Sequence, residues 1–141
     1  MNVTYESTYP QKDQYFKLFE STGWNKEYQL TEAELYKSIE NSWYMISAYE
    51  NGKLIGFGRI ICDGMLHALI VDMIILPSFQ RKGIGTAILD QLVSYCKLNQ
   101  IRDIQLFCAK GKAPFYERYG FSKRPEDAPG MQIKIIPETV Q

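Results

Sequence analysis

With 141 residues the chain has the length of one domain and is long enough to bury a hydrophobic core. Hydrophobic residues make up 45% of it and aromatic residues 13%, as in folded globular proteins. The 16 basic residues balance the 16 acidic ones, so the charge gives no general attraction for nucleic acid or an acidic membrane, and we expect neither partner.

The N-terminus and the cysteines bear on the compartment. No apolar run approaches the roughly 20 residues of a membrane span, and the first residues lack a signal-peptide pattern, which predicts a cytoplasmic protein. From its length we expect a single domain over residues 1–141. Cys62, Cys96 and Cys108 are odd in number and each lies in apolar sequence, which predicts reduced thiols in the core. Since His67 is the only histidine, we expect neither a Cys–His catalytic pair nor a metal site.

Two helices are predicted before the main sheet. After a short strand over residues 2–5, aromatic residues at helical spacing predict a helix over residues 11–20, and Ser-Thr-Gly at 21–23 ends it. The capping box at residues 31–34 begins the second helix. Trp24 and Tyr28 lie between the two helices, where they either cover the core or line a substrate groove.

The middle of the chain predicts an antiparallel meander. Strand-like runs at residues 43–49 and 53–61 flank Asn51-Gly52, the strongest short signal for a hairpin. Asp63-Gly64 leads from the second run to a third over residues 66–76. The third run is apolar at nearly every position apart from His67 and Asp72, which indicates a central strand covered on both faces.

A basic, glycine-rich turn follows the third strand. It reads Gln80-Arg81-Lys82-Gly83-Ile84-Gly85 and opens a helix whose apolar stripe runs to Cys96. Glycine permits backbone angles that let several N–H groups of residues 80–86 converge on one anion at the positive end of the helix. The turn therefore predicts a site for a phosphate or pyrophosphate. The Walker loop and the dinucleotide fingerprint fit poorly, because Lys82 precedes its glycine and Ile88 stands where a third glycine is needed.

The last third of the chain predicts a strand at residues 104–108, parallel to the strand before the turn, so that a crevice opens at their carboxyl ends. A short helix over residues 114–119 ends at Gly120. Phe121 and residues 131–136 are expected to form two final strands around a loop that carries Glu126 and Asp127. That loop is either a solvated hairpin tip or an acidic rim of an acceptor site.

Two motifs carry a family resemblance. The turn at residues 80–85 resembles the Gln/Arg-x-x-Gly-x-Gly/Ala signature of the GCN5-related N-acetyltransferases (GNAT), and Pro114-Phe115-Tyr116-Glu117-Arg118-Tyr119-Gly120-Phe121 resembles their second signature. The order of predicted elements is also similar over nearly the whole chain. The resemblance implies a mixed α/β fold in which an antiparallel meander leads into a splayed pair of parallel strands with flanking helices.

The resemblance also implies the cosubstrate and the residues that bind it. Acetyl-CoA, with no metal, would donate its acetyl group directly to a primary amine. Its pantetheine arm would bond to strand backbone at residues 73–75, its pyrophosphate to amides of residues 80–86, and Tyr116 would protonate the departing thiolate. The implied cosubstrate-binding set is Met73, Ile74, Ile75, Gln80, Arg81, Lys82, Gly83, Ile84, Gly85, Thr86 and Tyr116.

The incoming amine must lose a proton, which calls for an acceptor near the cleft. Asp72 is the best placed candidate, because a carboxylate that interrupts an apolar strand needs compensation. Its alternative role is a structural ion pair with Arg59 on the adjacent strand, and His67 is expected to be structural. The candidate acceptor-binding residues are Trp24, Tyr28, Asp72, Glu126 and Asp127.

The sequence thus predicts an acetyl-CoA-dependent N-acetyltransferase for a small primary amine, with Tyr116 and Asp72 as catalytic residues. A non-catalytic acyl-CoA-binding module and an acetyltransferase for protein amines remain as alternatives. The edge strands expected at the C-terminus make a homodimer a reasonable expectation.

Overall fold

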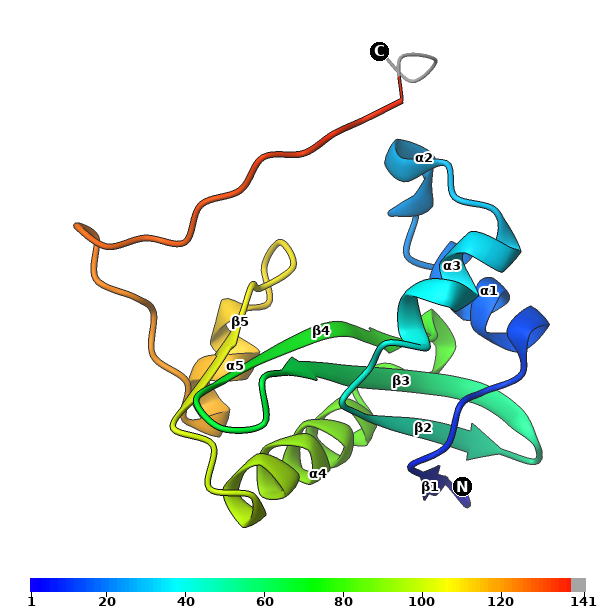
Figure 1. The fold of residues 1–141 in the computed structure, drawn as a ribbon. Coiled ribbons are helices and arrows are strands. Elements are labelled where there is room, and N and C mark those ends of the chain that lie inside the picture. Colours follow the sequence, from blue (N-terminus) through cyan, green and yellow to red (C-terminus); the bar gives the residue numbers. More distant parts are fainter. Residues whose placement is uncertain (138–141) are drawn as a thin grey trace.

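The computed structural model describes residues 1–137. The last four residues of the domain predicted from the sequence, 138–141, lie outside the described residues. A five-stranded sheet in the order β1-β2-β3-β4-β5 forms the centre of the fold (Figure 1). All neighbours are antiparallel except β4 and β5, which are parallel. In chain order the elements are β1 (Thr4–Glu6), α1 (Lys12–Glu20), α2 (Asn25–Tyr28), α3 (Glu32–Ile39), β2 (Tyr44–Glu50), β3 (Lys53–Cys62), β4 (His67–Ile75), a 3-10 turn (Pro77–Phe79), α4 (Ile84–Leu98), β5 (Asp103–Leu106) and α5 (Ala113–Tyr119).

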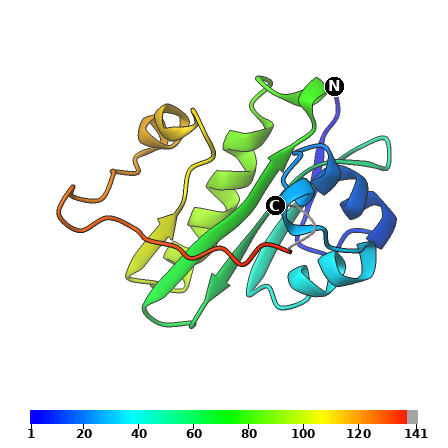
Figure 2. The ribbon, with the colours of Figure 1, turned by 90° about the horizontal axis from the view of Figure 1, so that it is seen from above.

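The sheet separates two hydrophobic cores. Helix α4 covers one face, and α1 to α3 lie over the other (Figures 1 and 2). The core under α4 contains Ile60 and Leu92, whereas the core under α1 and α3 contains Leu18 and Phe57, all almost fully buried. The apolar stripe predicted for α4 and the nearly continuous apolar run predicted for β4 both follow from this two-sided burial.

The predicted meander is confirmed, and its turns follow from local chemistry. Asn51 and Gly52 both adopt positive φ, 50° and 77°, as a two-residue hairpin requires. In the next turn the carboxylate of Asp63 accepts the amides of residues 65–67. The capping box of α3 also forms, with Thr31 Oγ1 accepting the Glu34 amide at 3.1 Å.

The number of helices before the meander was predicted wrongly, because the one-turn helix α2 shows no periodicity in the sequence. The side chain of Asn25 stabilises this turn. It donates to Glu20 Oε1 (2.8 Å) and to the carbonyl of Leu30 (2.9 Å), and it accepts the Leu30 amide (2.8 Å). These bonds depend on where the chain turns next, so hydrophobic spacing does not reveal them.

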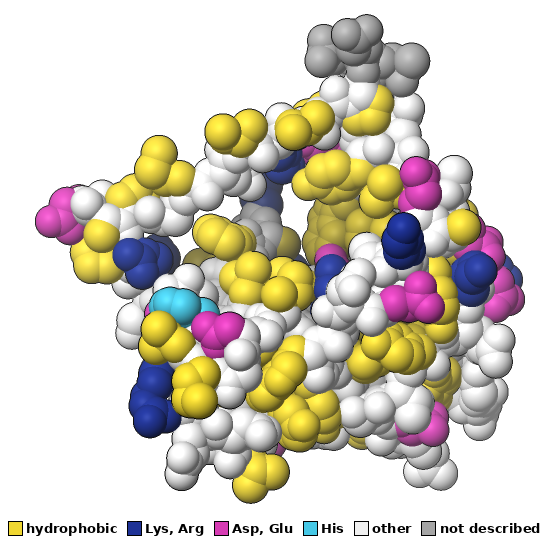
Figure 3. All heavy atoms as spheres, in the orientation of Figure 1, with side chains coloured by type: hydrophobic (Ala, Val, Ile, Leu, Met, Phe, Trp, Pro, Cys, Tyr) yellow, Lys and Arg dark blue, Asp and Glu magenta, His cyan; other side chains and the backbone are white. Residues whose placement is uncertain are grey.

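The prediction of two C-terminal strands was also wrong. Neither Phe121 nor residues 131–136 form a strand, and residues 131–137 instead run as an extended arm, apart from the sheet, toward α2 (Figures 1 and 2). Figure 3 shows that this arm carries hydrophobic side chains. Alternation of apolar residues predicts a strand only where a neighbouring edge accepts its hydrogen bonds, and residues 131–137 have no such neighbour in this structure.

The cysteines differ from one another. Cys96 is buried, Cys62 is half-buried and Cys108 is exposed, so the expectation of a core thiol is wrong for Cys108. All three are free thiols. Within residues 1–137, no helix has the length and apolar character needed to cross a membrane.

Candidate functional site

The parallel strands β4 and β5 separate part of the way along β4. Their pairing runs from His67 opposite Asp103 to Ile70 opposite Leu106, where β5 ends, while β4 continues to Ile75. The register between β3 and β4 shifts at this point, because Arg59 opposes Val71 but Phe57 opposes Ile74.

Two residues of β4, Asp72 and Met73, therefore stand opposite the single residue Gly58 of β3, and Asp72 adopts φ 55°. Such a bulge bends its strand, which opens the gap beside β5. A Cβ atom at Gly58 would lie 2.6 Å from the Met73 sulfur and 2.9 Å from Ile88 Cγ2, so any larger residue here would displace packed core side chains.

The backbone of residues 73–75 borders this gap. The Leu76 amide donates to the carbonyl of Ile55 in β3 at 2.9 Å. Because successive strand amides point in opposite directions, the Ile75 N–H points away from β3, toward the gap. Residues 73–75 are those whose backbone the family resemblance assigns to the pantetheine arm.

The glycine-rich turn ends at the N-terminus of α4 and has the features of an anion cradle. Arg81 and Gly83 adopt positive φ, 62° and 82°, and no side chain caps the 15-residue helix that follows. The amides of the first helical turn and the helix dipole are thus available to an anion. The Gln80 side chain connects the turn to the end of β4, because its amide nitrogen donates a hydrogen bond to the Ile75 carbonyl at 3.0 Å.

A cleft of about 710 Å³ joins the gap beside β4 to this turn. It brings together ten of the predicted site residues. They are Trp24, Met73, Ile74, Ile75, Gln80, Arg81, Gly83, Gly85, Thr86 and Tyr116.

Other cleft residues were not predicted from the sequence. Ser21 and Thr22 were interpreted only as a helix stop, although they line the cleft together with Trp24. Lys112 lies just before the second signature and Arg118 lies within it, and both add cationic side chains to the lining. Their position at that signature was the available signal.

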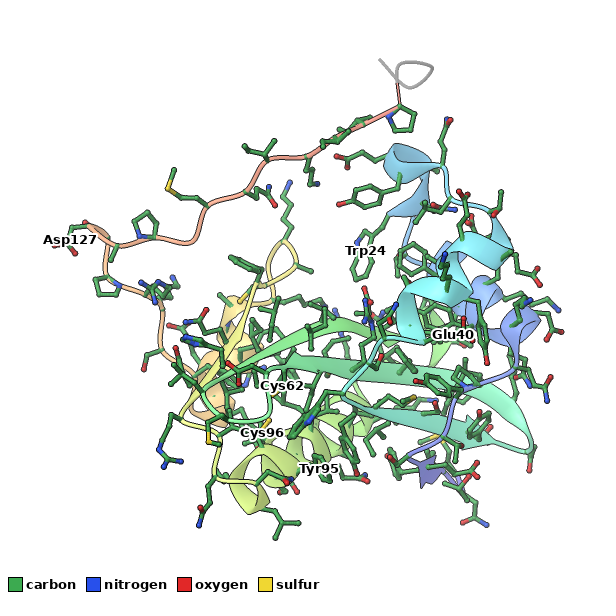
Figure 4. The ribbon with its side chains drawn as sticks, in the orientation of Figure 1. Trp24, Glu40, Cys62, Tyr95, Cys96 and Asp127 are labelled. Atoms are coloured by element: carbon green, nitrogen blue, oxygen red, sulfur yellow. The ribbon has the colours of Figure 1, made fainter. Side chains whose placement is uncertain are left out.

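The remaining predicted residues do not line the cleft. Ile84 is buried in the core under α4, and Lys82 places its ammonium 5.5 Å from the Phe79 ring centre. Tyr28 packs against Lys134 of the arm. Glu126 and Asp127 are exposed, and Figure 4 shows Asp127 at the tip of its loop, far across the molecule from Trp24.

Tyr116 lies where α5 meets the cleft and is 8% exposed. Its ring packs edge-on against Phe115 and Phe121, with centroids 5.0 and 6.0 Å away. Burial raises the pKa of Tyr116 to about 12, with a smaller contribution from nearby Cys108. The hydroxyl is therefore protonated at neutral pH and able to donate. Tyr119, one turn on, instead donates to Asp90 at 3.0 Å.

Asp72 forms the ion pair with Arg59 that the sequence suggested as its alternative role. Arg59 Nε and Asp72 Oδ2 are 2.7 Å apart, and their side chains are 10% and 21% exposed.

The Tyr15 hydroxyl is buried without a hydrogen-bond partner, and its pKa is raised by burial and then by the charge of Asp72. Within residues 1–137 no three His, Cys, Asp or Glu side chains cluster in a way that could hold a metal ion.

Comparisons with known proteins agree on one family. The sequence model of the Acetyltransferase (GNAT) domain matches residues 10–137. An uncharacterized N-acetyltransferase, ycf52, of Pyropia yezoensis is 34% identical over 119 residues, which cover 82% of this chain and 67% of that protein. The chloroplastic GCN5-related N-acetyltransferase 3 of Arabidopsis thaliana is 42% identical over 71 residues, or 50% of this chain and 30% of that protein.

Among solved structures, a probable acetyltransferase of Staphylococcus aureus, SA2161, superposes with a TM-score of 0.83 at 26% identity. The match covers 95% of this chain and all of that one. The chain thus spans the whole of this structural relative but about two thirds or less of the two sequence relatives.

Proposed function

The chain belongs to the GNAT acetyltransferase family, and from that membership we propose that it transfers an acetyl group from acetyl-CoA to the nitrogen of a small primary amine. One observation carries the proposal. The gap beside β4, the anion cradle at α4 and the residue Tyr116 line a single cleft. One continuous site can therefore hold the thioester and the pyrophosphate of acetyl-CoA beside a proton donor of the protein.

The cradle suits the pyrophosphate of the cosubstrate. Amides of residues 80–86 spread its charge over several donors, and the positive φ of Gly83 turns the backbone toward the anion. Lys112 and Arg118 add positive charge along the same cleft. Residues 73–75 supply strand backbone for the pantetheine arm.

Acetyl-CoA, when bound, supplies the activated acetyl group. Negative charge develops on the carbonyl oxygen as the amine attacks, and the Ile75 N–H is the proposed donor to that oxygen. A fixed backbone donor of this kind contributes roughly 3 kcal/mol in comparable sites. Tyr116, kept protonated by its burial, is proposed to deliver a proton to the departing thiolate.

Asp72 is the proposed group that binds or deprotonates the acceptor amine. Its carboxylate lies at the bulge, one residue before Met73 of the cleft lining. Arg59 already balances its charge, so the same carboxylate also has a structural role at the bend of β4. The Asp72→Asn variant separates the two roles, as described in the Discussion.

The size of the cleft supports a small acceptor. Its volume of about 710 Å³ lies in the range of small-molecule sites, 300–1,000 Å³, and it must hold the end of the pantetheine arm as well. We place the acceptor at the part of the cleft lined by Trp24, whose ring offers an apolar surface. The neighbouring hydroxyls of Ser21 and Thr22 donate to the carbonyls of Leu18 and Phe19.

A cytoplasmic location remains a prediction from the sequence, and the Arabidopsis relative is named chloroplastic.

The test is a panel of amines incubated with acetyl-CoA and followed by thiol release and mass spectrometry. It includes polyamines, arylalkylamines, amino sugars, amino acids and a lysine peptide. Acetylation of one small amine class well above the peptide supports the proposal. Turnover of the peptide alone indicates a protein acetyltransferase, and binding of acetyl-CoA without turnover of any amine indicates the non-catalytic module.

A further inference from the structure

One buried polar group in the core under α1 lacks a partner. Tyr15 is 1% exposed, and its hydroxyl is the single buried side-chain nitrogen or oxygen within residues 1–137 that forms no hydrogen bond. Folded proteins rarely leave such a group unpaired, because burying it without a partner costs free energy. The presence of the Tyr15 hydroxyl therefore needs a reason other than stability.

Tyr15 lies on the face of the sheet that carries the ion pair between Asp72 and Arg59. Helix α1 packs across β3 and β4, and the Tyr15 ring meets the Phe57 ring of β3 edge-on, with centroids 4.9 Å apart. Arg59 follows Phe57 by two residues in the same strand, so both side chains point to the same face of the sheet. Arg59 in turn binds Asp72 of β4. Tyr15 and the ion pair therefore share the layer between α1 and the sheet.

The charges of this ion pair act on the Tyr15 hydroxyl. Burial raises the pKa of Tyr15, the carboxylate of Asp72 raises it further, and the guanidinium of Arg59 lowers it. The hydroxyl is therefore protonated at neutral pH and able to donate. Because an arginine side chain only donates hydrogen bonds, the carboxylate of Asp72 is the acceptor in this group.

Only one carboxylate oxygen of Asp72 is bonded within the described residues. Arg59 Nε donates to Oδ2 at 2.7 Å, whereas no hydrogen bond from residues 1–137 reaches Oδ1. The terminal torsion of an aspartate side chain is soft, so a single bond leaves the plane of the carboxylate poorly fixed. A second donor would hold it in one orientation.

A row of aromatic rings joins Tyr15 to the cleft. The Phe19 ring lies 6.2 Å from the Tyr15 ring and 5.8 Å from the Trp24 ring, measured between centroids. Trp24 lines the part of the cleft at which we place the acceptor. Ile74 both packs in the core with Tyr15 and lines the cleft. Tyr15 therefore lies behind the acceptor part of the cleft.

We propose that Tyr15 is a positioning residue for Asp72, and that its hydroxyl donates to the Asp72 carboxylate when the ammonium group of the acceptor binds there. The ammonium becomes a second cation beside the carboxylate, and the bond from Tyr15 holds the carboxylate plane while Arg59 balances the charge. This inference rests on the proposed acetyl transfer and on the proposed role of Asp72. It explains the unpaired hydroxyl, since a group that lowers stability is retained where activity needs it.

The first test compares Tyr15→Phe with the parent, using the amine that the panel identifies. We expect kcat/KM for that amine to fall at least about fivefold, because a hydrogen bond to an ionised group is lost, while the Kd for acetyl-CoA stays within about twofold. The variant should also melt above the parent, since it no longer buries an unpaired hydroxyl. A purely structural role would not give a variant that is more stable and less active.

Tyr36→Phe is the matched control. Tyr36 packs against the same core, but its hydroxyl already donates to the Pro10 carbonyl at 2.7 Å. Loss of this bond should lower the melting temperature and leave kcat/KM within about twofold of the parent.

The second test asks whether Tyr15 acts through Asp72. Tyr15→Phe is combined with Asp72→Asn, and the double variant should have a kcat/KM within about twofold of Asp72→Asn alone, because the charged acceptor of the hydrogen bond is already gone. Two losses that multiply would mean that the residues act independently.

The outcomes separate this inference from the proposed function. A parent protein that acetylates no amine overturns both. An active parent with a fully active Asp72→Asn variant removes Asp72 from the reaction, and Tyr15 with it. If the parent is active and Asp72→Asn is slow, three results overturn the positioning role alone. They are a parental kcat/KM for Tyr15→Phe, a melting temperature of that variant below the parent, and losses that multiply in the double variant.

Discussion

Removal of the Tyr116 hydroxyl should slow turnover without weakening the fold. Tyr116→Phe keeps the ring and its edge-on contacts with Phe115 and Phe121, so we expect a melting temperature within about 2 °C of the parent. Acetyl-CoA affinity should also stay near the parent value. Loss of a general acid costs about 10²–10⁴ in rate, and an acidic CoA thiol places this case at the low end. We therefore expect at least a tenfold slower turnover, or about 1.4 kcal/mol of transition-state stabilisation.

The assay is thiol release with a saturating amine, and Tyr119→Phe is the control. Tyr119 lies one turn along the same helix, but its hydroxyl donates to Asp90 at the surface. Its loss should change turnover only a few-fold. Because burial raises the pKa of Tyr116 to about 12, the ratio of parent to Tyr116→Phe rates should be constant between about pH 7 and 9.5. Equal rates for Tyr116→Phe and parent would refute the assignment of Tyr116 as the acid.

Three further predictions concern Asp72, Gly83 and Tyr15. Asp72→Asn leaves the buried guanidinium of Arg59 without its counter-charge, so we expect a loss of about 1–3 kcal/mol in the free energy of unfolding. If Asp72 also binds or deprotonates the amine, kcat/KM should fall at least tenfold. Full activity per folded molecule would exclude Asp72 from the chemistry. Gly83→Val should raise the Kd for acetyl-CoA at least tenfold by calorimetry. No protein atom lies within 4 Å of the new Cβ, so the cause is the positive φ of 82°, which a β-branched residue does not adopt without strain. Gly64→Val, also at φ 82° in open space, should match its loss of stability yet bind normally; equally weakened binding in both would argue against the cradle. Tyr15→Phe removes a buried, unpaired hydroxyl and should raise the free energy of unfolding by about 1 kcal/mol in denaturant melts. Because the pKa of Tyr15 is raised in the folded state, the unfolded state releases the proton first, and the parent should lose stability as the pH rises above about 10. Tyr15→Phe has no proton to release and should lose less stability. Identical pH dependence of the two proteins would contradict this reasoning.

The sequence by itself determined the elements that depend on neighbours close along the chain. The Asn51-Gly52 hairpin, the cap at Thr31 and the stripe on α4 each follow from local backbone preference or from one buried face. The same holds for the glycine-rich turn, since Gly83 takes the positive φ that its residue type allows. With two motifs in the correct order, these local signals were enough to indicate the family and the region of the cleft.

Features that depend on contacts between distant residues were decided only by the tertiary structure. The bulge at Asp72 and its ion pair with Arg59 arise from the register between β3 and β4, which apolar spacing does not fix within one residue. The helix α2 is an exception, because Asn25 bonds to residues only five positions away on either side, yet hydrophobic spacing does not reveal such polar contacts. The alternation in residues 131–136 is that of a strand, but a strand exists only when another edge accepts its hydrogen bonds. The sequence therefore determined the strand-like pattern of the arm, and the tertiary structure decided that residues 131–137 run toward α2 without pairing with the sheet.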